Sequence, residues 1–341
     1  MEKKITTLKD IAKELKVSIA TVSRALQNKA EISVQTKRRV KAMARKLNYQ
    51  PNLLAQSLLN KRTNTIGVVV PEIKSHFFAS IIMGFKDVLR PLNYNLMVCQ
   101  SEESYKDEVK IFENLLRVQV DGILVSPSSA TTKFDHFLNL QKKGIPVVVF
   151  DRDSLGFETD KVLVDDYMGA FQAVDYLIQS GCKRVAHLAG PHKLSTTKHR
   201  LEGYVDALKK NNIPYDEAYI EHVKGFSHDD GLKPAKNLMK LNPQPDAIFA
   251  INDCIAISAM HVVKKLNLHI PDQVSIVGFD DEPHSKYFTP ALSTVWQPVY
   301  SIGILAAKIL LKQLQAETLE PPFRKEIFTP ELLIRASSKK I

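Results

Sequence analysis

From residue 65 onward the chain repeats its own pattern, and this repeat restricts the possible folds more than any other feature. Short apolar runs, at 66–70, 95–99, 122–125 and 146–150, are mostly followed by helical stretches. Such alternation predicts a parallel sheet covered by helices on both faces. IGVVVP…GFKDVL and VAHLAGP…GYVDAL share one spacing, because Ile66 precedes Gly84 by eighteen residues and Val185 precedes Gly203 by eighteen. We therefore expect two similar α/β lobes in tandem.

Two lobes in tandem predict a ligand cleft between them, lined by residues at the carboxyl ends of strands. The runs IPVVVFD and IPDQVSIVGFD both end in an aspartate, and a carboxylate can accept two hydroxyl hydrogens at once. Other candidates follow strands or lie in loops near them. For some of these positions an alternative role stays open. Either phenylalanine of the His76-Phe77-Phe78 run can be a core residue. Asp253, next to Asn252, can cap a helix, and Asp281, next to Asp280, can be simply solvated. The expected effector-binding set is Phe77, Phe78, Asp151, Thr196, Arg200, Phe226, Asn252, Asp280 and Gln297.

Positive charge is concentrated at the start of the chain. Residues 1–62 hold 15 lysines and arginines against 4 acidic residues, whereas residues 63–341 hold 32 and 33. A basic segment ahead of a nearly neutral body is typical of a module that binds a polyanion such as DNA.

The basic segment also has the pattern of three short helices. Apolar residues recur at helical spacing over 8–15 after a capping residue, Thr7, and Ser18 and Ser33 can cap the second and third helices. The very short turn between the first two helices predicts a helix-turn-helix unit. The alternative is a small bundle whose charges are only solvated. Against it, the second helix begins with exposed side chains suited to a major groove, namely Ile19, Ala20, Thr21, Ser23 and Arg24.

TLKDIAKELKVSIATVSRALQN, followed by ISVQTKRRVKAMARKLNYQPN, closely resembles the headpiece of the LacI/GalR family of bacterial repressors. The most specific part is the core V-S-x-x-T-V-S-R, which runs from Val17 to Arg24. The resemblance implies that Ile19, Ala20 and Arg24 read bases. It also implies a DNA-contacting set, largely at phosphates, made of Ser18, Thr21, Ser23, Thr36, Tyr49 and Asn52.

A leucine-rich stretch at 52–60, after Pro51, has the pattern of one short helix. So short a helix is not stable alone in water. It is either a core helix packed on the sensor or a segment that folds on DNA and wedges apolar side chains into the minor groove. The family resemblance implies the second role, with Leu58 at the intercalating position and Ala55 as its small neighbour.

The resemblance covers the whole chain and implies an all-α helix-turn-helix headpiece joined to an α/β two-lobed, periplasmic-binding-protein-like (type I) sensor. It also supports effector contacts by Asp151, Arg200, Phe226, Asn252 and Asp280. The last two crossings between the lobes are expected near Ser293 and Arg324. The expected boundaries are 1–51 for the DNA-binding domain, 52–62 for the hinge and 63–341 for the sensor, with an N-lobe at about 63–163 and 294–324 and a C-lobe at about 164–293 and 325–341.

The residues expected in the cleft favour a particular chemical class of effector. Carboxylates, an amide and aromatic walls suit a polyhydroxy ligand such as a sugar or sugar phosphate. Leu194 is apolar where purine-binding family members present arginine, which disfavours the alternative of a regulator that senses a nucleobase as corepressor. Two opposed half-sites need two headpieces, so a homodimer reading a pseudo-palindromic double-stranded operator is expected.

Other classes of protein are excluded on sequence grounds. The chain shows no secretion signal and no run near the roughly 18 apolar residues of a membrane span, so a cytoplasmic protein is expected rather than a periplasmic solute-binding protein. The three cysteines and ten histidines show no metal-ligand spacing. Motifs for nucleophilic, nucleotide-dependent and zinc enzymes are missing. We expect neither enzymatic activity nor a cofactor or metal.

Overall fold

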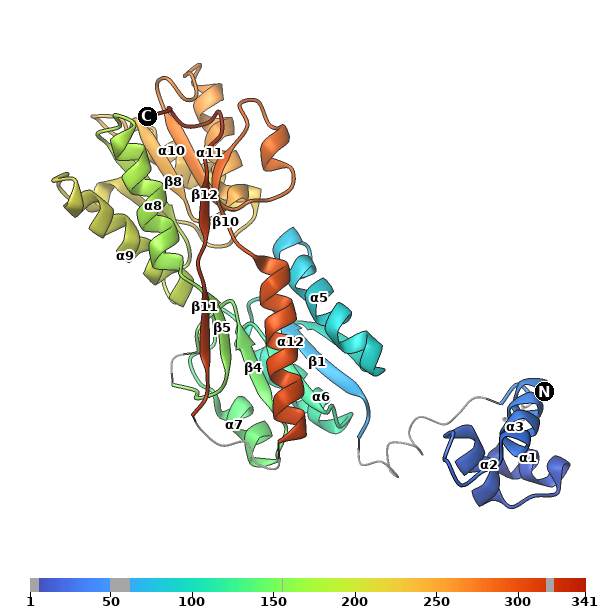
Figure 1. Ribbon diagram of the computed structural model, residues 1–341. Coiled ribbons are helices and arrows are strands. Elements are labelled where there is room, and N and C mark those ends of the chain that lie inside the picture. Colours follow the sequence, from blue (N-terminus) through green and yellow to red (C-terminus); the bar gives the residue numbers. More distant parts are fainter. Residues whose placement is uncertain (1–5, 50–61, 155, 317–321) are drawn as a thin grey trace. The chain divides into compact units, whose positions relative to one another are not determined.

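The computed structural model describes residues 6–49, 62–154, 156–316 and 322–341 (Figure 1). The chain divides into two compact units, Met1–Thr63 and Asn64–Ile341.

The first unit is a bundle of three helices, α1 (Leu8–Leu15), α2 (Ile19–Leu26) and α3 (Val34–Lys46). The turn between α1 and α2 is short because Lys16 adopts the left-handed conformation, with φ 51°. Ser18 Oγ accepts a hydrogen bond from the Thr21 amide at 3.0 Å, which caps α2, and Ser33 caps α3 in the same way. One apolar side of each helix builds the core, which consists of Ile11, Ala12, Val22, Ala25, Val40 and Ala44. The predicted helix-turn-helix fold is confirmed.

The second unit holds two lobes, each built on one six-stranded sheet. The N-lobe sheet has the order β11-β5-β4-β3-β1-β2, and its neighbouring strands are all parallel. Helices α5 and α12 cover one face, and α6 and α7 pack with the core on the other. The bounds are β1 Thr65–Val70, α5 His76–Leu89, β2 Asn95–Gln100, α6 Tyr105–Arg117, β3 Gly122–Val125, α7 Asp135–Lys142, β4 Val147–Phe150, β5 Lys161–Val164, α12 Val299–Gln315 and β11 Lys325–Phe328.

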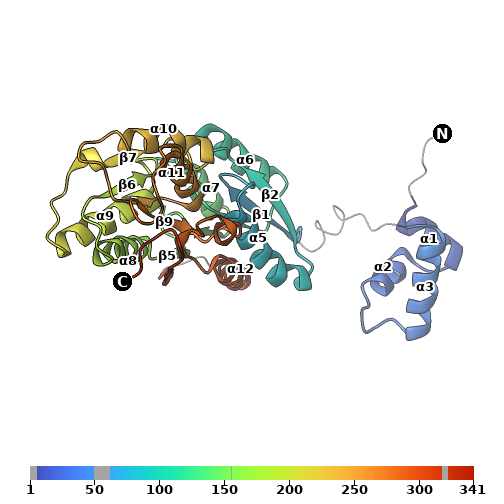
Figure 2. The same cartoon turned by 90° about the horizontal axis from the view of Figure 1, so that it is seen from above.

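The C-lobe sheet has the order β12-β10-β9-β8-β6-β7 and is parallel except for β12, which runs antiparallel to β10. Helices α8 and α9 pack on one face, and α10 and α11 on the other (Figure 2). The bounds are α8 Asp166–Gln179, β6 Val185–Ala189, α9 Ser195–Lys210, β7 Ile220–His222, α10 His228–Leu238, β8 Ala247–Ala250, α11 Asp253–Lys265, β9 Ser275–Asp280, β10 Ser293–Trp296 and β12 Glu331–Leu333, with 3₁₀ turns at Arg90–Leu92, Glu217–Tyr219 and Ser285–Tyr287.

The internal repeat predicted from the sequence is present strand by strand, since β1, β3 and β4 hold the same places in one sheet as β6, β8 and β9 in the other. The repeated glycines also share a role. A Cβ on Gly84 would lie 2.5 Å from the Tyr300 carbonyl oxygen of α12, and Gly203 faces the backbone of α8 at Tyr167 equally closely. Both glycines let two helices approach backbone to backbone.

The last two crossings between the lobes fall later than expected. Strand β10 still pairs with β9 through Trp296, so this crossing lies between Trp296 and α12 rather than near Ser293. Strand β11 pairs with β5 of the N-lobe, so the last crossing lies between Phe328 and Glu331 rather than near Arg324 (Figure 1). An apolar strand pattern does not reveal which of two similar sheets the strand joins. Among the described residues, no helix is both long and apolar enough to cross a lipid bilayer.

Candidate functional site

The predicted DNA-reading surface is the N-terminal end of α2. Ile19 is 48% exposed although it is a large apolar residue, and Ala20 beside it is also exposed. The Thr21 hydroxyl lies 2.8 Å from Ser18 Oγ, so a second hydrogen bond beside the capping bond orients this side chain. Small or exposed side chains at the start of a helix are the arrangement that a major groove admits.

Arg24 lies on the same helix with its side chain 57% exposed, and its Nε is 3.7 Å from a carboxylate oxygen of Glu31. An exposed ion pair of that length is weak, so the guanidinium can turn toward another partner. Ser23 and Thr36 are half-buried. Tyr49 packs against the headpiece core, and burial raises the pKa of its hydroxyl. Asn52, Ala55 and Leu58 lie outside the described residues, and their roles stay predictions.

In the sensor unit, the two repeated aspartates lie at equivalent strand ends of opposite lobes. Asp151 follows β4 and Asp280 ends β9. Both have positive φ, 65° and 109°, a conformation that non-glycine residues rarely adopt. The two side chains and Arg200 belong to one electrostatic cluster, because Arg200 lowers the pKa of both carboxyls and Asp151 raises that of Asp280.

Arg200 is held in place from three sides. Its Nε and Nη2 each lie 2.7 Å from Asp166 Oδ1, and Nη1 donates to the Ile251 carbonyl. The guanidinium carbon also lies 3.6 Å from the centre of the Phe279 ring. Helix α9 begins at Ser195, so Arg200 lies in its second turn.

Asp166 is buried, and Asp151 and Asp280 are half-buried, which changes the acidity of their carboxyl groups. Burial raises the pKa of Asp151 to about 6, with Asp166 raising it further and Arg152, the Ser126 hydroxyl and Arg200 lowering it. Burial likewise raises the pKa of Asp280 well above its ordinary value. Groups perturbed in this way, gathered between two lobes, are typical of a binding site.

Several other predicted residues surround this cluster. Gln297 is buried and its Nε2 donates to Asp280 Oδ1 at 2.7 Å. Asn252 caps α11, since Oδ1 accepts from the Ile255 amide at 2.9 Å, and its Nδ2 donates to the Phe226 carbonyl at 3.2 Å. These bonds leave one donor hydrogen on the amide. Thr196 is buried in the first turn of α9.

The aromatic residues after β1 divide between two environments. Phe78 is 5% exposed and belongs to the N-lobe core, with its ring 6.5 Å from that of Phe150. The effector-binding assignment of Phe78 is therefore not supported, because its ring faces the core. Phe77 is half-buried, with its ring edge-on to Phe78 at 5.1 Å, and stays a candidate.

The structure also brings in residues that sequence reasoning missed, above all Arg152. Its guanidinium makes two hydrogen bonds to Glu103, at 2.8 and 2.9 Å, and one to the Pro127 carbonyl at 3.0 Å. It lies 5.7 Å from the centre of the Phe226 ring of the C-lobe. Asp253, the alternative helix cap, is instead buried and accepts hydrogen bonds from Glu282, Ser285 and Thr294. Asp253 therefore holds the loop that follows Asp280.

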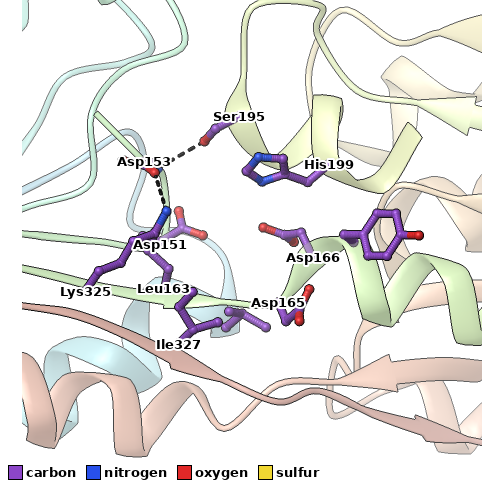
Figure 3. A pocket seen from close by; sticks show the side chains of 11 residues that line it. Asp151, Asp153, Leu163, Asp165, Asp166, Ser195, His199, Lys325 and Ile327 are labelled. Atoms are coloured by element: carbon purple, nitrogen blue, oxygen red, sulfur yellow. Dashed lines mark hydrogen bonds and ion pairs between the residues drawn. The ribbon is translucent and has the colours of Figure 1, made fainter. Parts of the chain in front are cut away.

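A cavity of about 190 Å³ borders the cluster at Asp151 and Asp166 (Figure 3). The two lobes meet beside it, where Ser195 Oγ accepts a hydrogen bond from the Asp153 amide at 3.0 Å. The lining comes from both lobes: Asp151, Asp153, Leu163, Val164, Asp165, Asp166, Tyr167, Ser195, His199, Lys325 and Ile327. Across the described ranges, no three His, Cys, Asp or Glu side chains are grouped so as to hold a metal ion.

Two segments of the chain match models of known protein families. Residues 7–52 match the bacterial regulatory proteins of the lacI family, and residues 174–338 match the periplasmic binding protein-like domain. The "Ribose operon repressor" of Halalkalibacterium halodurans is 32% identical over 335 residues, which cover 98% of this chain and 98% of that protein. The chain is therefore a LacI-family transcriptional regulator.

Solved structures of such regulators have the same architecture. A crystal structure of the Lac repressor dimer bound to operator and an anti-inducer matches 99% of this chain and 100% of its own, with a TM-score of 0.87 and 24% identity. A complex of the regulator CelR with cellobiose covers 97% of this chain and 99% of its own, with a TM-score of 0.73 and 27% identity. The predicted fold is confirmed. The family regulates transcription and is not enzymatic, as expected.

Proposed function

We propose that this DNA-binding repressor works as a homodimer on a pseudo-palindromic operator and that a sugar-like effector in the sensor controls its affinity. The observation that carries the effector assignment is the pair of half-buried aspartates, Asp151 and Asp280, which come from opposite lobes with Arg200 in their cluster. A ligand whose hydroxyls reach both carboxylates favours the closed arrangement of the lobes. The ribose operon repressor and the CelR–cellobiose complex are relatives named for sugars.

Support for the dimer comes from one edge of the N-lobe sheet. Strand β2 is an edge strand, yet Met97 and Val98 on it are 39% and 42% exposed. Met83 of α5 and Leu92 of the following turn are also more than half exposed. Unpaired edges with apolar side chains are normally covered by a partner. The related Lac repressor forms a dimer on its operator. We propose that this chain likewise acts in the cytoplasm, where a bacterial operator lies.

The DNA-binding part of the proposal is tested by operator affinity. Short duplexes selected from a random pool by the purified full-length protein supply the operator, and fluorescence anisotropy measures the dissociation constant. Arg24→Ala is expected to weaken binding by about 1–3 kcal/mol and to relax selectivity at one base pair of each half-site. Arg117→Ala, which removes an exposed arginine of the sensor, is the matched control and should leave affinity unchanged. If the Arg24→Ala protein binds each duplex as tightly as the wild type does, the proposed base reading is contradicted.

The effector part is tested separately by thermal shift with a panel of sugars. A true effector should raise the melting temperature of the wild type, change operator affinity and lose both effects in Asp280→Ala. A coupling of about 1–3 kcal/mol, or about 5–150-fold in operator affinity, is expected. A sugar that saturates the sensor and leaves operator affinity unaltered would contradict the proposal that the effector controls DNA binding.

A further inference from the structure

The positive charges around the cluster are already neutralised by protein groups. Arg152 makes two hydrogen bonds to the Glu103 carboxylate and a third to a backbone carbonyl. Arg200 makes its short contacts to Asp166 and the Ile251 carbonyl. These contacts use three of the five N–H groups of each guanidinium, and each positive charge is already balanced by a carboxylate.

The lysines that contact Asp153, a residue lining the neighbouring cavity, are also engaged. Lys161 and Lys325 both pair with Asp153, at 2.7 and 3.0 Å, from opposite sides of its carboxylate. Among the described residues that line the cavity or belong to the cluster, each arginine and lysine thus has an acidic partner. His199 of α9 faces Asp166 and lowers the pKa of that carboxyl.

Two carboxyls of the cluster have no such close cation. Asp151 accepts a hydrogen bond from the Ser126 hydroxyl at 2.9 Å, and its nearest guanidinium nitrogen, on Arg152, is 3.7 Å away. Asp280 accepts from the neutral amide of Gln297. Further acids, Asp253 and Glu282, lie close enough to raise the pKa of Asp280. The cluster therefore has an excess of acceptors, contributed by both lobes, and Asp151, whose pKa is about 6, carries negative charge at pH 7.5.

We propose that the effector site selects an uncharged polyhydroxy ligand, whose hydroxyls donate to Asp151 and Asp280, and rejects phosphorylated or carboxylated analogues. This rests on the proposed sugar-sensing function and narrows it, because sugars and sugar phosphates fit that function equally. A hydroxyl donated to a carboxylate satisfies a buried acceptor, whereas a second anion meets like charge in a site from which water is excluded. One unit charge about 5 Å from a carboxylate weakens binding by at least tenfold at the effective dielectric of such sites.

The test compares matched sets of ligands on the full-length protein by isothermal titration calorimetry. Each set contains a neutral aldose or disaccharide, the 6-phosphate of its sugar and the corresponding uronic acid, at one ionic strength and pH 7.5. We expect at least one neutral member to bind and its two anionic counterparts to bind at least about tenfold more weakly. A phosphate or uronate that binds as tightly as its neutral counterpart, or more tightly, overturns the inference and leaves the proposed repressor function standing.

Charge-neutral variants give a second, independent readout. Asp280→Asn keeps the shape of the side chain and removes one carboxyl of the cluster, so the ratio of neutral to anionic affinity should narrow at least about threefold. Asp151→Asn does the same from the opposite lobe, and melting temperatures without ligand verify that both variants fold. Asp229→Asn removes an exposed charge on α10 and should leave the ratio unchanged. An unaltered ratio in both folded cluster variants contradicts the inference. If no sugar of any set binds while the operator is still recognised, the sugar-sensing proposal and this inference fail together and DNA binding stands.

Discussion

Replacing Arg200 by methionine is expected to destabilise the sensor unit strongly. The Arg200 side chain is 7% exposed and its partner Asp166 is 5% exposed. Methionine keeps an apolar chain that can pack on Phe279, but it removes every hydrogen bond to Asp166 and to the Ile251 carbonyl. Removal of one partner from a buried ion pair costs about 3–5 kcal/mol, because the remaining charge is left buried and uncompensated.

The loss caused by Arg200→Met should also depend on pH. Burial raises the pKa of Asp151, Asp166 and Asp280, and Arg200 opposes this rise in all three. An acid whose pKa is raised by folding favours the folded state fully below its ordinary value of about 4, and that stability is lost as the pH rises through the folded pKa. Without Arg200 the three pKa values rise further. The variant should therefore lose more stability at pH 8 than at pH 5, because a smaller share of these carboxyls is ionised at the lower pH.

Urea unfolding of the full-length protein at both pH values measures the effect. Calorimetry should show the sensor transition at pH 8 lowered by about 6–10 °C. Arg184→Met is the matched control, because Arg184 pairs with Asp246 at 3.2 Å while 42% exposed, and such a pair contributes about 0–1 kcal/mol. If Arg200→Met is no more destabilising at pH 8 than this control, Arg200 is not the buried counter-ion described above.

Two further predictions concern the scaffold of the site. Burial raises the pKa of Asp253 to about 7, so the wild type should lose stability as the pH rises from about 4 to 7. Between pH 5 and 8, the unfolding free energy of Asp253→Asn relative to that of the wild type should rise by about 3 kcal/mol. Urea curves at both pH values that show no such rise would contradict the burial of this carboxyl. Gly84→Ala places a Cβ 2.5 Å from the Tyr300 carbonyl oxygen, so thermal melting should show a loss of stability of about 1–3 kcal/mol or more. The control Ala79→Gly, on the exposed side of the same helix, should cost about 1 kcal/mol. Equal losses of stability in the two variants would refute the close approach of the two helices.

The sequence predicted the topology well because its repeat is a property of whole strands and helices. Equal spacing from Ile66 to Gly84 and from Val185 to Gly203 requires the same β–α unit twice, and the two sheets have matching strand orders. What the repeat leaves open is where single strands belong. The late strand β11 joins the N-lobe sheet because its hydrogen-bond partner is β5, and no local pattern specifies that partner.

At the site, strand-end reasoning located Asp151 and Asp280, but it missed Arg152 directly after one of them. Arg152 acts through Glu103, which lies 49 residues away in sequence, so no local signal identified the pair. Phe78 was a different case, because a signal was present. Phe78, Ile81, Phe85 and Leu89 recur at helical spacing and are all buried, which marks Phe78 as core and leaves Phe77 on the flank.

The energetics of the two aspartates support the proposal that ligand binding, and not folding, explains them. Each occupies a backbone conformation that is strained for a non-glycine residue, and each has a carboxyl whose pKa burial raises, so both weaken the folded state near neutral pH. A single position of this kind needs no explanation beyond its local packing. Two, at equivalent strand ends of lobes that fold around separate cores, need a common cause outside either core. The proposed ligand, by donating hydroxyls to both, would supply that cause, because it would satisfy acceptors of both lobes at once.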